Sequence, residues 1–158
     1  FDCRGVYQVF QAYSEGNILH FLNTQGSVVQ RVEFPRQELS EMLCAADFVG
    51  GKEKTPIDTV GVFAVTTGSK VRGLAQEFKE KGDYLTSHGL QALAVETAEA
   101  FAEYMHARIR KDWGIKEELS MKEMIQTKYQ GIRLSFGYPA CPDLDGQKVI
   151  LIFSSPRK

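Results

Sequence analysis

The sequence predicts an α+β fold, a twisted and mainly antiparallel β-sheet flanked by helices. The first third of the chain holds β-branched and aromatic segments separated by short turn signals, which is typical of an antiparallel meander. The second half holds segments in which apolar residues recur at helical spacing. With 158 residues, the chain is long enough to bury a core as one domain.

Three β-strands are expected in the first third of the chain. Residues 5–13 are rich in β-branched and aromatic side chains, which favours a strand. Turn signals at residues 14–17 and 25–26 separate this segment from strands over residues 18–22 and 28–34. Because such short turns join neighbouring strands, the three segments should pair antiparallel.

Three further apolar segments lie outside this meander. Apolar residues at helical spacing predict a short helix over residues 39–46. A nearly continuous apolar run over residues 57–67 predicts a buried central strand. Residues 148–153 are expected to form the final strand.

Two longer helices are expected in the middle of the chain. The first follows Ser69, which is placed to cap it, and should end at Gly82. The second is the longest element and should cover residues 89–111. A later, shorter helix should start at Met121, because the preceding Ser120 opens a capping box. That shorter helix is expected to end near residue 129, before Gly131.

The longest helix carries an apolar stripe and an opposite polar side. The apolar side holds Leu90, Leu93, Ala94, Thr97, Phe101 and Met105, together with Arg108. The polar side holds Glu99, Glu103, His106 and Arg110, and a solvated face is the default interpretation. Glu103 and His106 have the Glu-x-x-His spacing of di-iron bundles, but the second copy that such sites need is missing. A third interpretation turns Glu99 inward at a ligand cleft.

The run from Arg133 to Pro142 is the strongest candidate for a binding loop. Arginine presents a planar fork of donors that suits a carboxylate or phosphate. Gly137 permits close approach of the backbone or a positive φ, and Pro139 and Pro142 favour an extended, rigid strip. Such a strip suits the polar edge of a flat heterocycle. The alternative is a proline-rich surface turn with its arginine in a salt bridge.

Composition and cysteine spacing exclude several classes of protein. The chain has 19 Lys+Arg against 20 Asp+Glu and no basic stripe, so nucleic acid is not an expected partner. No apolar run approaches the roughly 18 residues that span a membrane. Cys3, Cys44 and Cys141 show neither disulfide nor zinc spacing, which indicates a reducing compartment. Cys141 is expected to be a small buried residue, and no catalytic triad can be assembled.

The run over residues 129–142 resembles the signature of the activation domain of cobalamin-dependent methionine synthase. Other stretches resemble the same family in the right order. They are residues 14–17, 34–37, 43–48, 65–68, 84–90, 98–106 and 108–110. The resemblance covers roughly residues 5–148, nearly the whole chain. It implies a single activation-type domain over residues 1–158, truncated at both ends relative to the family.

The resemblance also implies a function. The family binds S-adenosylmethionine and presents it to an oxidised corrinoid, so that cob(II)alamin is reductively methylated with an electron from flavodoxin or a similar flavoprotein. Cobalamin is carried by a partner domain. Carried over to this sequence, Arg133 would hold the ligand carboxylate, Ser135, Gly137 and Tyr138 would line the pocket, and Glu99 would lie near the charged end. The domain would position its ligand without a catalytic residue or a metal of its own.

Three interpretations of function follow from this resemblance. The first is a cytoplasmic domain of a methyltransferase, 5-methyltetrahydrofolate–homocysteine methyltransferase, that is not catalytic on its own. The second is a docking module for flavodoxin and the corrinoid domain without ligand binding. The third is a stand-alone reactivator of another corrinoid methyltransferase. The intact Arg133, Gly137 and Tyr138 favour ligand binding.

Overall fold

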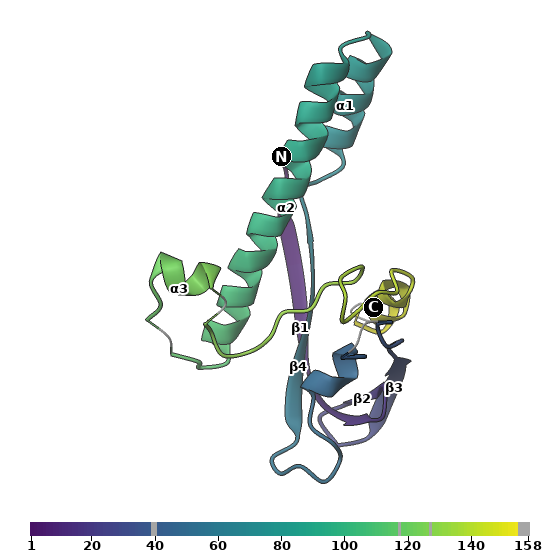
Figure 1. The fold of residues 1–158 in the computed structure, drawn as a ribbon, viewed down its shortest axis with the longest axis vertical. Helices are drawn as coiled ribbons and strands as arrows, with labels where there is room; N and C mark the ends of the chain where they lie inside the picture. The colour runs from purple at the N-terminus through teal and green to yellow at the C-terminus, as the bar shows by residue number, and fades with distance from the viewer. Residues whose placement is uncertain (39–40, 117, 127, 155–158) are drawn as a thin grey trace. The chain divides into compact units, whose positions relative to one another are not determined.

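A computed structural model describes residues 1–38, 41–116, 118–126 and 128–154 of the chain (Figure 1). The strands and helices occur in two groups along the chain, with a single-turn 3-10 helix, η1, between strands. They are β1 (Arg4–Glu15), β2 (Ile18–Leu22), β3 (Val28–Glu33), η1 (Ala45–Phe48), β4 (Asp58–Thr66), α1 (Lys70–Glu80), α2 (Tyr84–Asp112), α3 (Met121–Ile125) and α4 (Gly146–Ser154). The predicted α+β class is confirmed.

The chain divides into two compact units. Unit 1 contains residues 1–7 and 63–130, and unit 2 contains residues 8–62 and the described residues from Gly131 onward. Unit 1 therefore holds α1, α2 and α3, whereas unit 2 holds β2, β3, η1 and α4. The strands β1 and β4 each run from one unit into the other.

The four strands form one sheet in the order β3-β2-β1-β4. The pairs β1–β2 and β2–β3 are antiparallel, with Tyr13 opposite His20 and Leu19 opposite Val32. Gly16, at φ 62°, makes the tight turn between β1 and β2. The chain enters unit 2 along β1 and leaves it along β4, so these neighbours also run antiparallel. The predicted meander is confirmed.

The prediction that residues 57–67 form a buried central strand is wrong in two respects, position and burial. They do form a strand, β4, but it lies at an edge of the sheet and its residues are half-buried or exposed. Val60 and Val62 pack against the core of unit 2, which explains part of the apolar run. An apolar run indicates contact with a core, but it does not show how many strands flank it.

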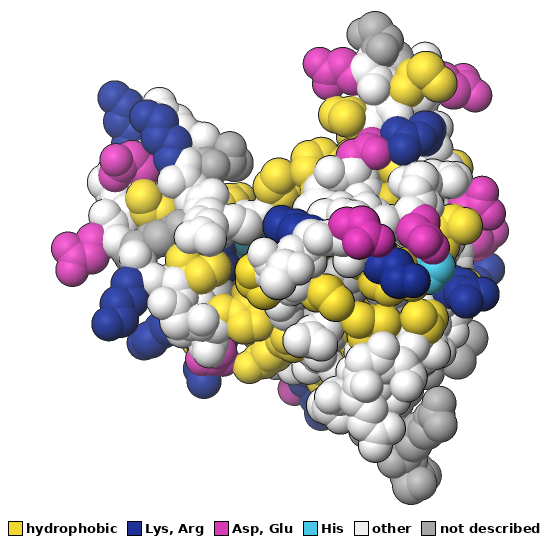
Figure 2. All heavy atoms as spheres, turned by 90° about the horizontal axis from the view of Figure 1, so that it is seen from below, with side chains coloured by type: hydrophobic (Ala, Val, Ile, Leu, Met, Phe, Trp, Pro, Cys, Tyr) yellow, Lys and Arg dark blue, Asp and Glu magenta, His cyan; other side chains and the backbone are white. Residues whose placement is uncertain are grey.

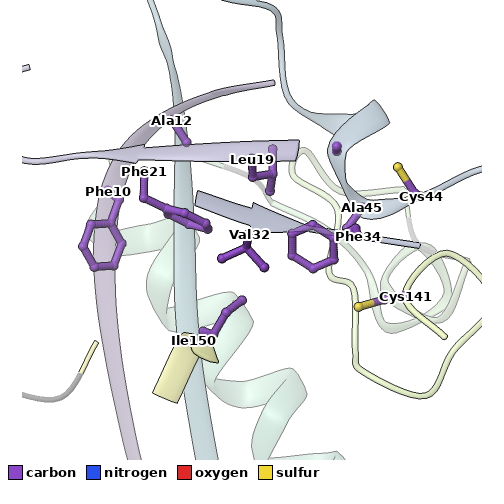
Figure 3. Packing of buried hydrophobic residues seen from close by; sticks show 11 residues of the cluster. Phe10, Ala12, Leu19, Phe21, Val32, Phe34, Cys44, Ala45, Cys141 and Ile150 are labelled. Carbon is purple, nitrogen blue, oxygen red and sulfur yellow. The ribbon is translucent and has the colours of Figure 1, made fainter. Parts of the chain in front are cut away.

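The core of unit 2 lies where the meander meets the segments that follow it (Figure 3). The buried cluster contains Phe10, Ala12, Leu19, Phe21, Val32, Phe34, Cys44, Ala45, Ala46, Cys141 and Ile150. Phe10 and Phe21 pack edge to face with ring centroids 5.6 Å apart. The cluster therefore joins strand residues to Cys141 in the candidate loop and to Ile150 near the C-terminus.

The expected strand over residues 148–153 is a helix, α4. Ile150 is buried in the core of unit 2, whereas Val149 and Leu151 on either side of it are exposed. The helix contacts β3. A short apolar run does not distinguish a buried strand from a buried helix, and packing against β3 overrides the strand preference of β-branched residues here.

In unit 1, α1 and α2 pack as a helical hairpin. Gly82, at φ 81°, ends the first helix, as predicted. Ser69 precedes that helix but makes no capping hydrogen bond through its side chain. The long helix begins at Tyr84, earlier than expected, because Asp83 accepts a hydrogen bond from the backbone N–H of Thr86 at 3.0 Å.

The polar side of α2 is only partly solvated. Glu99 and Glu103 are exposed, but His106 and Arg110 are buried. Nη1 of Arg110 lies 3.1 Å from Nδ1 of His106, and the guanidinium carbon lies 4.3 Å from the centre of the Tyr129 ring. The default interpretation is therefore wrong at these two positions, because a ring from a later segment packs over them. Leu93, on the predicted apolar side, is exposed.

Two short helices differ from their predicted ranges. Residues 39–40 lie outside the described residues, and residues 41–44 are not helical; the 3-10 helix η1 follows instead. The predicted capping box is confirmed, since Ser120 and Glu123 bond reciprocally at the start of α3. That helix ends at Ile125, before the predicted limit near residue 129.

The surface of the described residues mixes charges of both signs. On the face in Figure 2, acidic and basic side chains occur beside each other, in keeping with the nearly even charge balance. None of the helices that the structure describes combines the length and the apolar character needed to cross a membrane.

The core assignment predicts a large effect for Phe21→Ala. Phe21 is 1% exposed, so its truncation leaves a cavity in the core of unit 2. Such substitutions lower the free energy of unfolding by about 3–5 kcal/mol. Denaturant unfolding measures the loss. Val29→Ala, at an exposed valine, is the control and should change the value by about 0.5 kcal/mol or less. Equal effects of both substitutions would contradict the assigned core.

Candidate functional site

The loop from Arg133 to Pro142 lies in unit 2 and is held by its own backbone hydrogen bonds. The N–H of Tyr138 donates to the carbonyl of Ser135 at 3.3 Å, and the N–H of Cys141 donates to the carbonyl of Tyr138 at 2.8 Å. The N–H of Gly137 donates to the carbonyl of Cys141 at 2.8 Å. The expected extended strip is thus replaced from residue 136 onward by two consecutive turns, which make it rigid in a different way.

Gly137 supplies the backbone freedom that these turns require. Its φ is +90°, a region that residues with a Cβ atom rarely adopt. A Cβ atom at this position would also lie 3.0 Å from Cδ2 of Leu144. The sequence-based expectation of a positive φ is confirmed, and a substitution here would alter the turn that presents Tyr138.

Arg133 is half-buried, and the loop itself orients its side chain. Nη1 of Arg133 donates to Oγ of Ser135 at 3.1 Å. A guanidinium carries five N–H donors in a fixed plane, so one contact to the loop orients a fork that suits a carboxylate. The structure therefore brings two of the predicted site residues into direct contact.

Tyr138 presents an aromatic surface at the turn. Its side chain is 56% exposed although its backbone is bonded on both sides. A ring held by a rigid backbone offers a flat wall to another ring, or a negative face to a cation. Four of the predicted site residues, Arg133, Ser135, Gly137 and Tyr138, thus belong to one ordered loop.

The opposite side of the loop is anchored in the core of unit 2. Phe136 stacks on Phe34 with ring centroids 6.3 Å apart and an interplanar angle of 26°. Cys141 is 4% exposed and belongs to the same buried cluster as Cys44 (Figure 3). Phe34 and Cys44 come from the segment after β3. Neither is identifiable as a support for the loop from sequence pattern alone.

That supporting segment is itself held by an ion pair. Both terminal nitrogens of Arg36 bond the carboxylate of Asp47 at 2.9 Å. Oδ2 of Asp47 also accepts the N–H of Cys44 at 2.8 Å. The Arg36 guanidinium, followed by the Cys44 N–H, lowers the pKa of Asp47 below its ordinary value. The ionised form of Asp47 therefore stabilises the segment on which the loop packs.

Cys141 is suited to packing and not to nucleophilic chemistry. Burial, assisted by the nearby charge of Asp143, raises the pKa of the Cys141 thiol to about 11. A thiol with this pKa is almost entirely protonated at neutral pH, and the thiolate is the reactive form. The expectation that Cys141 is a small buried residue is confirmed.

Glu99 lies apart from this loop in the division of the chain. It is an exposed residue of α2 in unit 1, whereas the loop belongs to unit 2. The contribution of Glu99 to the site therefore stays a prediction. Its carboxylate is the kind of group that stabilises a nearby positive charge.

The loop offers binding groups and no apparatus for covalent catalysis. Within the described parts of the chain, no group of three or more His, Cys, Asp and Glu residues could hold a metal ion. His106, half of the Glu-x-x-His motif, packs edge-on against Tyr129 with centroids 5.1 Å apart. The loop's arginine fork, aromatic wall and turn carbonyls suit a ligand with a carboxylate and a flat ring.

Comparison with known proteins gives consistent matches. Residues 1–154 match the family model described as the activation domain of vitamin B12 dependent methionine synthase. Methionine synthase of Mycobacterium tuberculosis is 32% identical over 171 residues, covering 97% of this chain and 14% of that protein. Methionine synthase of Mycobacterium leprae is 31% identical with the same coverage. The chain therefore spans about one seventh of the length of these curated relatives.

A solved structure has the same fold. The crystal structure of the MetH reactivation domain bound to AdoHcy, or S-adenosylhomocysteine, matches with a TM-score of 0.81 and 37% sequence identity. The match covers 95% of this chain and 49% of that chain.

Burial of two of the three cysteines predicts the pattern of thiol labelling. Cys3 is exposed, whereas Cys44 and Cys141 are buried. At pH 8 an aromatic disulfide reagent should label one thiol rapidly in the folded protein and all three after unfolding. Absorbance of the released thiolate measures the count. Cys3→Ser should abolish the rapid phase, and rapid labelling of more than one thiol would contradict the packing of the loop.

The ion pair beneath the loop predicts a dependence of stability on pH. The folded-state pKa of Asp47 is lowered, so its contribution is fully present above the ordinary value of 3.8 and is lost as pH falls through the folded-state pKa. Asp47→Asn should therefore destabilise the protein most above pH 5 and least at the lowest pH. Urea unfolding across pH 3–7 tests this.

The control for this pH series is Asp145→Asn. The pair of Asp145 with Lys148 is largely exposed, so its removal should have little effect at any pH. A difference between wild type and Asp47→Asn that does not shrink as pH falls would contradict the assigned role of the Asp47 charge.

Proposed function

We propose that this chain binds S-adenosylmethionine at the loop from Arg133 to Pro142, because it belongs to the family of activation domains of vitamin B12 dependent methionine synthase. In this role it positions the methyl donor for reductive methylation of cob(II)alamin carried by a partner domain. The observation that carries the proposal is the half-buried Arg133, oriented by Ser135 on an ordered loop beside the exposed Tyr138.

The ligand carboxylate pairs with Arg133 in this proposal. A carboxylate accepts two parallel N–H bonds from a guanidinium, and such charge-assisted bonds are stronger than neutral ones. Partial burial of Arg133 strengthens the pairing, because less water competes for the charges. The contact with Ser135 reduces the ordering that the arginine side chain undergoes on binding.

The adenine and its substituents lie against the turn in this proposal. The ring of Tyr138 provides a flat wall for adenine. The N–H groups of Gly137 and Tyr138 donate within the loop, so these two residues would contact the ligand through their carbonyl oxygens. Carbonyl oxygens accept from the exocyclic amino group of adenine and from the ligand's ammonium group.

The sulfonium centre requires a compensating charge, and we assign this role to Glu99. Its carboxylate lies on the rigid helix α2 and is of the sign that stabilises a sulfonium. The aromatic face of Tyr138 is a second group that attracts a cation. These two groups favour S-adenosylmethionine, which carries the positive charge, over the neutral thioether of the demethylated product.

In this proposal the reactive groups belong to other domains and proteins, which explains why the site in this chain is made of binding groups. The corrinoid of the partner domain supplies the nucleophile that accepts the methyl group, and a flavoprotein such as flavodoxin supplies the electron. This chain binds the methyl donor and orients its sulfonium methyl group. Such a role needs neither a general base nor a metal ion within the chain.

The wider setting is also proposed. The chain spans 14% of the length of the methionine synthases it matches, so homocysteine methylation from 5-methyltetrahydrofolate is assigned to a larger assembly that includes a cobalamin-binding domain. Residues 1–158 would act there as one activation-type domain that is not catalytic on its own. The free thiols of Cys3, Cys44 and Cys141 favour a location in the reducing cytoplasm.

Titration calorimetry tests the ligand and the role of Arg133. Wild type should bind S-adenosylmethionine saturably, and Arg133→Ala should bind at least about tenfold more weakly, because a charge-assisted pair is lost. Arg31→Ala, at an exposed arginine of β3, is the matched control and should bind as wild type does.

The outcomes of this titration separate the hypotheses. Absence of binding by wild type would contradict the ligand proposal and favour a docking module. Equal affinities of wild type and Arg133→Ala would contradict the assigned role of the arginine while leaving the ligand in place.

A further inference from the structure

Gln37 is a buried polar residue that contacts the tip of the loop. Its side chain is 9% exposed and lies in unit 2, in the segment after β3. Its amide faces the carbonyl oxygen of Pro139 at 3.2 Å and the N–H of Leu43 at 3.3 Å. Because a carbonyl requires a donor and an N–H requires an acceptor, one amide orientation satisfies both groups.

In that orientation Gln37 joins the loop to the supporting segment. Its amide nitrogen donates to Pro139, and its amide oxygen accepts from Leu43. Its own backbone N–H also donates to the carbonyl of Leu43 at 3.0 Å, which fixes the residue at a second point. The side chain therefore reaches the loop from a position that the backbone already holds.

The Gln37 contact is made at Pro139, in the turn that presents Tyr138. Pro139 follows Tyr138 directly and lies within the turn closed by the bond from the Cys141 N–H to the Tyr138 carbonyl. Proline lacks a backbone N–H, so its carbonyl is the only backbone hydrogen-bonding group by which it can be held. The Gln37 bond thus fixes the Pro139–Ala140 peptide plane, one residue beyond the proposed ring-binding residue Tyr138.

We propose that Gln37 is a positioning residue for the ligand: its side-chain amide holds the Pro139 carbonyl and thereby fixes the turn that presents Tyr138. The inference rests on the proposed function for the identity of the ligand. Phe34 and Cys44 anchor the loop through apolar contacts, which are not directional. The hydrogen bond of Gln37 adds the direction that sets the orientation of the turn.

The first test replaces Gln37 with methionine, which has a similar length and no amide. Gln37→Met should bind S-adenosylhomocysteine about tenfold more weakly than wild type in titration calorimetry, measured well below the unfolding temperature of both. Gln25→Met, at an exposed glutamine in the turn before β3, is the matched control and should bind as wild type does. Equal affinities of wild type and Gln37→Met would overturn the proposal.

A second variant separates positioning from a purely structural role. In Gln37→Glu, the protonated carboxyl can donate to Pro139 and accept from Leu43 as the amide does, whereas the ionised form places a negative acceptor against the carbonyl of Pro139. Burial favours the protonated form. The affinity of Gln37→Glu relative to wild type should therefore be near one at pH 5 and fall severalfold by pH 8.

The affinity of Gln37→Glu divided by that of wild type reports the ionisation of the new carboxyl. The ionisable groups of the supporting segment and of the loop are common to both proteins, so their titration cancels in the ratio. They are Arg36, Glu38, Glu41, Cys44 and Asp47 in the supporting segment, Arg133, Tyr138 and Cys141 in the loop, and Asp143 directly after the loop. A ratio that is independent of pH would show that the hydrogen-bonding state of this side chain does not affect binding, and that result would overturn the proposal.

Amide hydrogen exchange distinguishes failure of this inference from failure of the proposed function. The N–H groups of Gly137 and Cys141 are bonded within the turn, so their protection reports its order without any ligand. Protection should fall severalfold in Gln37→Met and be unchanged in Gln25→Met. If wild type does not bind S-adenosylhomocysteine, only the ligand assignment fails, and unchanged protection in Gln37→Met would then overturn the role of Gln37.

Discussion

The candidate site depends on burial of one side of the loop from Arg133 to Pro142 in the core of unit 2. Phe136 packs on Phe34, and Cys141 joins the buried cluster. These apolar contacts oppose the entropy of a chain segment that has no helix or strand to order it. With that side buried, the backbone bonds of the turns close, and the ring of Tyr138 stays exposed on the ordered loop.

In the proposed methyl transfer, this domain contributes a binding loop that is already ordered before the ligand arrives. Its proposed substrate is reactive by itself, and the nucleophile belongs to another domain, so the chain acts by binding and orientation. A loop that is ordered before binding loses less conformational freedom when the ligand arrives. The ion pair of Arg36 and Asp47 belongs to this account, because it holds the segment on which the loop packs.

Much of the fold could be predicted from local sequence, and the failures have physical causes. The turn signals around β2 predicted its observed bounds, and the capping box predicted the residue at which α3 begins. The short apolar run of α4 had no local signal that separates helix from strand. Burial of His106 and Arg110, and the contact of Gln37 with Pro139, depend on segments far away in sequence.

The most direct test of the account is a crystal structure of this chain with S-adenosylhomocysteine. The account predicts the ligand carboxylate within hydrogen-bonding distance of the Arg133 guanidinium, the adenine against the ring of Tyr138, and a loop backbone displaced by less than about 1 Å from the structure described above. A ligand bound at another surface would contradict the account. So would a loop that refolds around the ligand, because the turns would then not be ordered in advance.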